Sequence, residues 1–294
     1  MKDIDGAMLS LDGLSTGDAF GELFFSIPLM PPGARTLPPP EWRWTDDTHM
    51  ALSIVDVLAR CGRIDRDVLA AAFAGRYVQE PWRGYGGGAR RLLRELSRGG
   101  DWKTLSPALF GGGSYGNGGA MRAAPIGGFF GGEPARAAEE ARHSAMVTHA
   151  HEEGQAGAMA VAAAASLAAG DDCPKGREFI REVAAFTPSG ETCSGIEASL
   201  SVDGEDLRSA VQLLGTGERV SAQDTVPFCI WCAAYHLEDF EEAMWWTVSG
   251  QGDRDTTCAI VGGIVALSSR GIPEAWLRRR EPLPEGFGRR RREH

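Results

Sequence analysis

The sequence predicts an all-α fold, a single compact orthogonal helical bundle over residues 1–280. Apolar residues recur at helical spacing along most of the chain, for instance in residues 177–186, 205–214 and 226–235. Nowhere does the alternating pattern typical of β-strands persist, alanine is abundant, and runs of β-branched residues are few. With 43% hydrophobic residues the 294-residue chain can bury a sizeable core.

The first expected helix covers residues 4–16 and leads into Gly17-Asp18-Ala19-Phe20-Gly21. Such small residues let a backbone pass close to another helix or to a ligand, and the sequence leaves both alternatives open. Six prolines between residues 27 and 40 exclude regular structure there, so we expect a surface loop that leads to Trp44.

The first acidic cluster is Trp44-Thr45-Asp46-Asp47-Thr48, directly before an apolar helical pattern over residues 50–61. This arrangement puts carboxylate and hydroxyl oxygens on the first turn of a helix, where they could bind a hard cation. Threonine and aspartate are also ordinary N-cap residues, so a plain helix cap is the alternative.

The second acidic cluster, Gly252-Asp253-Arg254-Asp255-Thr256-Thr257, also precedes an apolar helical run, residues 258–267. The two clusters can meet only through tertiary folding, and this favours one domain. Together they offer four carboxylates, a set that suits Mg²⁺ or Mn²⁺ better than zinc. Because unpaired carboxylates repel one another, a cation would stabilise their convergence. We therefore expect a metal site between helix N-termini.

Two glycine-rich stretches are candidate ligand loops. Residues 83–88, Arg-Gly-Tyr-Gly-Gly-Gly, open into a helical pattern and expose backbone N–H groups that suit phosphate. No Gly-Lys-Ser/Thr follows, so this is not a P-loop, and an unbound turn is the alternative. Residues 111–119 combine six glycines with Ser114, Tyr115 and Asn117, which permits close backbone approach to a bulky ligand.

Thr148-His149-Ala150-His151-Glu152-Glu153 is a third group of polar side chains. Two histidines at i and i+2 do not share a helix face, which argues against a zinc pair on one helix. A structural histidine is the simple alternative. The alanine-rich residues 154–169 permit close helix crossing, so we place them centrally in the bundle.

Charge and cysteine content narrow the function classes. A net charge of −10 argues against binding to nucleic acid or to an anionic membrane surface. The tail 281–294, rich in arginine, proline and glycine, is expected to be disordered. Six scattered cysteines indicate reduced thiols, with Cys229 and Cys232 as buried small residues. No segment resembles a secretory signal or a membrane span, so we expect a soluble cytoplasmic protein.

Taken in order, these blocks resemble the ADP-ribosylglycohydrolases, which remove ADP-ribose from modified targets. The resemblance rests on Gly17 to Gly21, Trp44 to Thr48, Gly113 to Arg122, Thr148-His149 and Gly252 to Thr257. It implies two Mg²⁺ or Mn²⁺ ions held by Thr45, Asp46, Asp47, Asp253, Asp255 and Thr256. It also implies ADP-ribose contacts from Gly84, Tyr85, Gly86, Gly113, Ser114, Tyr115, Gly116, Asn117 and His149.

In the sequence of its two glycine-rich loops the chain is most similar to the family branch that acts on serine-linked and other O-linked ADP-ribose. That similarity implies an ADP-ribosylated protein substrate, cleavage of the C1″ glycosidic bond and ADP-ribose as product, and we expect a monomer. Two alternatives stay open: a metal-dependent hydrolase of a free ADP-ribose-type nucleotide, and a non-catalytic ADP-ribose-binding protein.

The chain departs from the family pattern at one position. Several members carry a glutamate four residues after the glycine that corresponds to Gly21, and here that position is Phe25. A phenyl ring cannot transfer a proton, so Glu22 is the expected substitute, with a solvated surface glutamate as the alternative. Glu22, Asp47 and Asp255 are therefore the predicted catalytic carboxylates.

Overall fold

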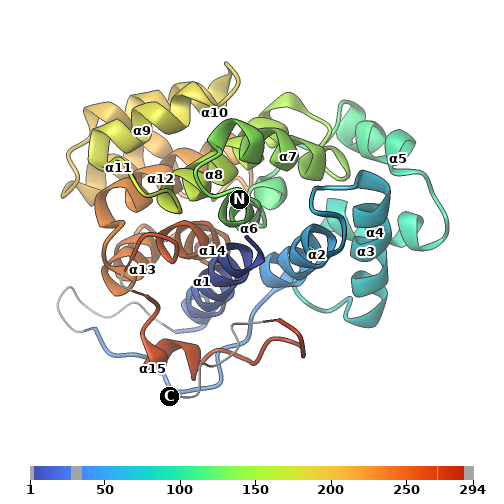
Figure 1. Cartoon of the computed structure of the whole chain (residues 1–294), viewed down its shortest axis with the longest axis horizontal. Coiled ribbons are helices and arrows are strands. Elements are labelled where there is room, and N and C mark those ends of the chain that lie inside the picture. Colours follow the sequence, from blue (N-terminus) through green and yellow to red (C-terminus); the bar gives the residue numbers. More distant parts are fainter. Residues whose placement is uncertain (1–2, 28–34, 270, 288–294) are drawn as a thin grey trace.

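Two helices from opposite ends of the chain form the centre of the structure. The computed structural model describes residues 3–27, 35–269 and 271–287. Helices α1 (Ile4–Leu23) and α14 (Arg254–Val265) pack along each other's length, and Figure 1 shows them side by side in the middle of the molecule. Residues 10–21 of α1 and residues 256–265 of α14 are buried, which explains the apolar and small-residue composition of these stretches.

The other helices surround this pair. To the right in Figure 1 lie α2 to α5, and α8 to α12 lie above and to the left. Their bounds are α2 (Asp46–Cys61), α3 (Arg66–Gln79), α4 (Gly87–Ser97), α5 (Trp102–Ala108), α6 (Ala124–Phe129), α7 (Pro134–Met146), α8 (Glu152–Ala168), α9 (Gly176–Ala185), α10 (Glu191–Ala198), α11 (Leu207–Leu214), α12 (Ala222–His236), α13 (Phe240–Ser249) and α15 (Glu274–Leu277). Short 3₁₀ helices are η1 (Leu109–Gly111), η2 (Asn117–Gly119) and η3 (Ser199–Ser201).

Three glycines spaced by four residues allow α1 and α14 to touch through their backbones. A Cβ atom built on Gly13 would lie 2.3 Å from the Gly262 carbonyl oxygen. One on Gly17 would lie 2.0 Å from the Cys258 oxygen, and one on Gly21 would lie 2.1 Å from the Arg254 oxygen. These distances are too short for any side chain. The small residues of α1 therefore serve helix packing, and they bring its last turns beside the N-terminus of α14.

The all-α prediction is confirmed for the described residues, in which no β-strand occurs. The first acidic cluster does begin a helix, and α2 starts at Asp46, four residues before the apolar pattern, because Thr45 caps it. Helix α8 is central as expected, with Ala158 and Ala160–Ala165 fully buried. Cys229 and Cys232 are buried and unpaired. No helix in the described ranges is long and apolar enough to cross a membrane.

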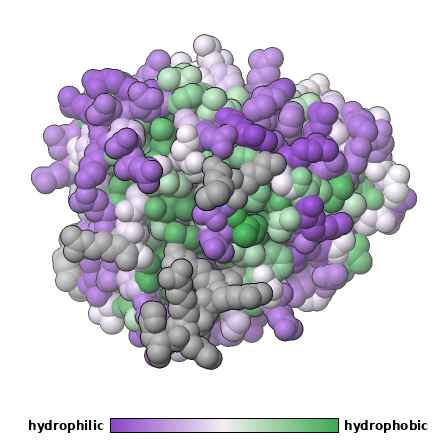
Figure 2. Space-filling view, viewed as in Figure 1, coloured by the Kyte–Doolittle hydropathy of each residue, from purple (hydrophilic) through white to green (hydrophobic). Residues whose placement is uncertain are grey.

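Below α1 in Figure 1, the segment between α1 and α2 runs beside the C-terminal segment that contains α15. Trp42 and Arg280 form a parallel bridge, and Trp42 and Trp276 pack against Phe20 of α1. The predicted tail, 281–294, falls partly outside the described residues. Its described part, 281–287, lies against the domain, with the Phe287 ring 5.2 Å from the Arg76 guanidinium. In Figure 2, hydrophilic side chains line the rim of this face and apolar ones lie nearer its middle.

The α1–α14 contact predicts a strong effect of one methyl group. Gly17→Ala should lower the free energy of unfolding by at least about 1–3 kcal/mol, the usual cost of overpacking, because the Cys258 carbonyl cannot move without displacing α14. Urea unfolding followed by circular dichroism would measure this loss.

Gly75→Ala is the matched control. Gly75 lies inside α3 with open space around the position of its missing Cβ, so alanine there should be neutral or stabilise by up to about 1 kcal/mol. Equal stability of the two variants would contradict the close-packing account.

Candidate functional site

The first acidic cluster forms the N-terminus of α2. Thr45 is the N-cap residue, and its hydroxyl lies 2.9 Å from Asp47 Oδ2. Asp47 is 1% exposed, and its other oxygen, Oδ1, has no hydrogen-bond partner. Asp46 beside it is only partly buried. Thr45 alone caps the helix. The carboxylates of Asp46 and Asp47 in the first turn are not needed for the cap.

Asp18 of α1 is a site residue that the sequence analysis missed. It is fully buried and accepts hydrogen bonds from the backbone N–H groups of Thr45 (2.9 Å) and Thr48 (3.1 Å) and from both hydroxyls. One carboxylate therefore fixes the start of α2 to α1. The signal available in the sequence was an acid among small residues in a strongly apolar helix.

The second acidic cluster forms the N-terminus of α14. Asp253 is the N-cap residue, Asp255 lies in the first turn, and Thr256 is buried behind them. Asp255 Oδ1 is buried without a hydrogen-bond partner. Because Gly21 touches Arg254, this helix start lies directly beside the end of α1 and hence near Asp18.

Electrostatics show that the two clusters meet. Burial raises the pKa of Asp46 to about 7, and the charge of Asp18 adds to this rise. Burial also raises the pKa values of Asp47 and Asp255 well above the ordinary range. Asp47 is repelled by Asp18 and by the carboxylates of both clusters, and Asp255 by Asp253 and Asp18. The pKa of Asp18 rises to about 6 through burial, against four hydrogen bonds that lower it. The folded chain therefore gathers mutually repelling acids at one place.

These acids fit a hard divalent cation by their chemistry. They are oxygen ligands, two of their oxygens are buried without partners, and a cation would relieve their repulsion. Within residues 3–27, 35–269 and 271–287, no three acidic, histidine or cysteine side chains yet converge closely enough to ligate an ion.

The first glycine-rich loop lies against the first acidic cluster. Gly84 has φ +94°, which favours glycine at this turn, and a Cβ there would lie 3.3 Å from Asp46 Oδ1, a tight contact. Gly86 is the N-cap residue of α4, with open space around it. Tyr85, which the resemblance places on ADP-ribose, is 1% exposed, and its hydroxyl lies 2.9 Å from His49 Nδ1. Its ring is therefore part of the core.

The second glycine-rich loop is only partly open. Ser114 is buried, and its hydroxyl accepts from the Gly116 N–H, whereas Tyr115 is 49% exposed. Gly113 packs against the backbone at Ala150. The resemblance places Asn117 on ADP-ribose, but its side-chain amide donates to Asp253 Oδ2 at 2.7 Å. That amide is directed at the second acidic cluster, because the loop passes beside α14.

His149 is held as a neutral imidazole beside this loop. Arg122 donates to the Thr148 hydroxyl (2.8 Å), which lies 2.7 Å from His149 Nδ1. Burial, with the charge of Arg122, lowers the pKa of His149 to about 3. The Nε2 atom lies next to Gly116 and Gly118. Arg122 and Thr148 were not among the predicted site residues.

Glu22 lies in the last turn of α1, near the second acidic cluster. Burial raises its pKa, and so does the charge of Asp253. Phe25 lies beyond the helix end and is 52% exposed, with its ring 5.3 Å from the Arg254 guanidinium. Of the two positions, only Glu22 presents an acidic group to the clusters.

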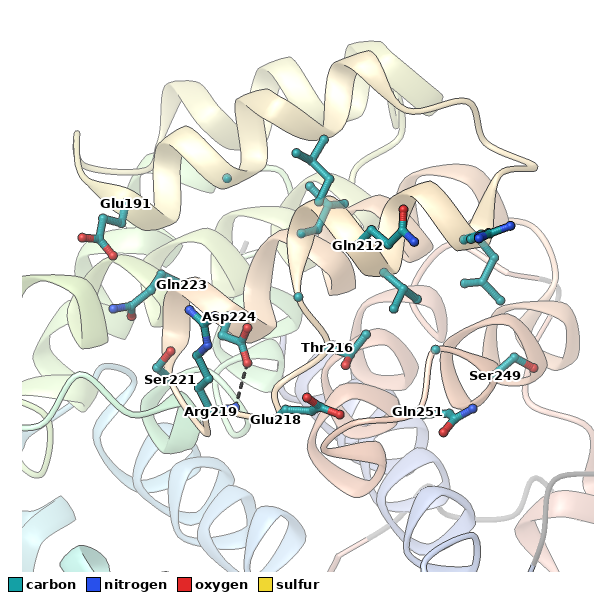
Figure 3. A pocket seen from close by; sticks show the side chains of 18 of the residues that line it. Glu191, Gln212, Thr216, Glu218, Arg219, Ser221, Gln223, Asp224, Ser249 and Gln251 are labelled. Atoms are coloured by element: carbon teal, nitrogen blue, oxygen red, sulfur yellow. Dashed lines mark hydrogen bonds between the residues drawn. The ribbon is translucent and has the colours of Figure 1, made fainter.

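A cavity of about 1190 Å³ opens beside the second acidic cluster (Figure 3). Polar side chains from α10 to α13 and the intervening loops line it, among them Gln212, Ser221 and Gln251, and none of the clustered aspartates does. The cavity meets the cluster at Thr216, whose carbonyl accepts from the Asp253 N–H at 3.0 Å. The polar cavity therefore lies next to the clustered aspartates, but their side chains do not line it.

Comparison with known proteins decides the family. A model of the family described as ADP-ribosylglycohydrolase matches residues 3–292. The chain belongs to the ADP-ribosylglycohydrolase family. It is therefore a hydrolase by family, and the resemblance stated from the sequence is confirmed.

Individual relatives agree with this family. "ADP-ribosylhydrolase ARH3" of Danio rerio is 28% identical over 270 residues, covering 80% of this chain and 72% of the relative. The protein of the same name from Homo sapiens is 27% identical, covering 79% and 73%. A solved structure titled "ADP-ribosylglycohydrolase-related protein complex" matches 96% of this chain and 94% of its own with a TM-score of 0.56. At 23% identity, that structure supports the fold alone.

The raised pKa of Asp46 predicts a pH-dependent stability in metal-free protein. Asp46 keeps its proton up to about pH 7 when folded but only to about its ordinary pKa of 3.8 when unfolded. The folded chain binds the extra proton, so this contribution to stability is full below pH 4 and is lost as pH rises to about 7. Asp46→Asn should not show this loss.

Urea unfolding in EDTA at pH 5 and pH 8 would measure it. Between these values the stability of the wild type should fall relative to Asp46→Asn. Parallel pH dependence of the two proteins would contradict the burial and repulsion described for Asp46.

Proposed function

We propose that this protein is a metal-dependent hydrolase that removes ADP-ribose from modified protein side chains by cleaving the C1″ glycosidic bond. The observation that carries the proposal is the meeting of Asp46 and Asp47 with Asp253 and Asp255 at two helix N-termini. The substrate is an ADP-ribosylated protein, and ADP-ribose is a product. The glycine-loop similarity favours O-linked sites such as serine.

Two Mg²⁺ or Mn²⁺ ions are the cofactors in this proposal, held by Thr45, Asp46, Asp47, Asp253, Asp255 and Thr256. When bound, such ions polarise substrate oxygens and make water more acidic. The chain itself orients their ligands: Asp18 fixes Thr45 and Thr48, and Asn117 fixes Asp253. Ligand positions therefore depend on hydrogen bonds from two separate parts of the chain, α1 and the second glycine-rich loop.

The remaining groups suit the rest of the substrate. His149 offers a neutral imidazole, and Gly84, Gly86 and Gly116 offer backbone that a ribose or diphosphate can approach. Tyr115 offers an exposed ring. Glu22, with its raised pKa, can exchange a proton near the bond that breaks, since glycoside hydrolysis needs a carboxylate to assist water or the leaving group.

The proposal is tested by product release from defined substrates. Serine-linked, arginine-linked and nucleotide-linked ADP-ribose would be incubated with the wild type, and release of free ADP-ribose would be measured by chromatography. EDTA should abolish release and Mg²⁺ or Mn²⁺ should restore it. Asp46→Asn should lose both metal binding and release. Asp56→Asn, on the exposed part of the same helix, should retain them.

The alternatives give different products. Release of AMP and ribose phosphate from free ADP-ribose would favour a nucleotide hydrolase acting at the pyrophosphate. Binding of ADP-ribose without turnover on every linkage would favour a binding protein. Full activity after exhaustive metal removal would contradict the metal-dependent mechanism.

Glu22→Gln gives a separate prediction about proton transfer. It should lower kcat roughly 10²-fold or more, the range for loss of a positioned acid or base, while ADP-ribose affinity measured by calorimetry stays unchanged. Asp5→Asn, exposed in the first turn of the same helix, is the control and should have wild-type kcat. Wild-type turnover in Glu22→Gln would reject the role.

A further inference from the structure

Arg83 and Glu281, far apart in sequence, form a two-bond ion pair close to the first acidic cluster. The Arg83 Nη1 and Nη2 atoms each donate to one Glu281 oxygen at 2.8 Å. Their side chains are 13% and 21% exposed, so solvent screens this pair less than an ordinary surface pair. Parallel bonds from a guanidinium to a carboxylate also fix orientation, which a lysine cannot do.

The same guanidinium holds the chain just before the acids. It lies 3.5 Å from the centre of the Trp44 ring, and Nη1 also donates to the Trp44 carbonyl oxygen at 3.2 Å. Trp44 directly precedes Thr45, the cap of α2. The residue after Arg83 is Gly84, whose α-carbon faces Asp46. Arg83 is thus fixed between the two segments that flank the first acidic cluster.

Glu281 is itself held in place from the opposite side. Its backbone N–H donates to the Trp42 carbonyl at 2.7 Å, and the Trp42 N–H donates to the Arg279 carbonyl at 2.7 Å. Arg280 forms a buried ion pair with Asp12 of α1. Because α1 is packed against α14, these contacts give the Glu281 carboxylate a fixed position relative to the metal-site helices.

We propose that Glu281 is a positioning residue for the first acidic cluster and acts through Arg83. The C-terminal segment holds Trp44, Thr45 and Gly84 in the arrangement that presents Asp46 and Asp47 to a cation. Without Glu281, Arg83 keeps Glu80 as its ion-pair partner, a residue at the end of α3 that bonds only Nε. The guanidinium would then turn away from the Trp44 carbonyl. The cation part of this inference rests on the proposed function; the ordering of residues 44–48 does not.

The first test measures local order in metal-free protein. Hydrogen exchange would be followed at the Thr45 and Thr48 amides, which donate to Asp18, and at core amides of α14. In Glu281→Gln, protection at Thr45 and Thr48 should fall tenfold or more while the α14 amides keep theirs. Arg83→Lys should act alike, and the double variant should add little, because both changes break one connection. Glu285→Gln, an exposed glutamate of the same segment, is the control.

The second test measures Mg²⁺ affinity by calorimetry. Glu281→Gln should weaken it about 10- to 100-fold, as expected when a residue that orients metal ligands is lost, and Glu285→Gln should not. A uniform loss of protection over the whole chain would mean that Glu281 only stabilises the fold and would overturn the inference. So would unchanged protection at Thr45 and Thr48. If the wild type bound no Mg²⁺, the proposed function would fail, while hydrogen exchange would still decide the positioning role.

Discussion

The backbone contact between α1 and α14 is the constraint on which the rest of this structure depends. Gly13, Gly17 and Gly21 remove side chains from one face of α1, so the α14 carbonyl groups can lie against it. This contact places Asp18 between the starts of α2 and α14 and brings four further carboxylates from distant parts of the chain together. In the absence of a cation the repulsion between these carboxylates opposes folding, and the packing of α1 against α14 must offset it.

The helices and the two acidic helix starts were predictable because their signals are local. Helix caps, the spacing of apolar residues and the absence of the alternating pattern of β-strands can each be recognised within a window of about fifteen residues. Asp18 was not predicted, because its partners Thr45 and Thr48 are distant in sequence. The resemblance placed Tyr85 on the ligand, and in the structure its ring is buried in the core against Tyr77. Asn117 bonds Asp253 because of where its loop passes, which no local pattern shows.

Polar contacts extend the site well beyond its predicted ligands. Asp18 and Asn117 hold the metal-ligand candidates directly, Arg122 and Thr148 hold the His149 ring, and Arg83 with Glu281 holds the segment that leads into α2. Each of these hydrogen-bonded contacts connects a different helix or loop to a clustered carboxylate or to a glycine-rich loop. In the proposed mechanism the chemistry therefore depends on residues spread from α1 to the C-terminal segment, and Glu22 has the proton-transfer role because Phe25 replaces the family glutamate.

Anomalous diffraction from crystals soaked in Mn²⁺ would test the central claim most directly, because it locates the ions without reference to activity. The account predicts two peaks about 3.5–4 Å apart, with Asp46, Asp47, Asp253 and Asp255 rotated onto them. Absence of peaks at the meeting point of α2 and α14, or peaks bound only elsewhere on the protein, would contradict it.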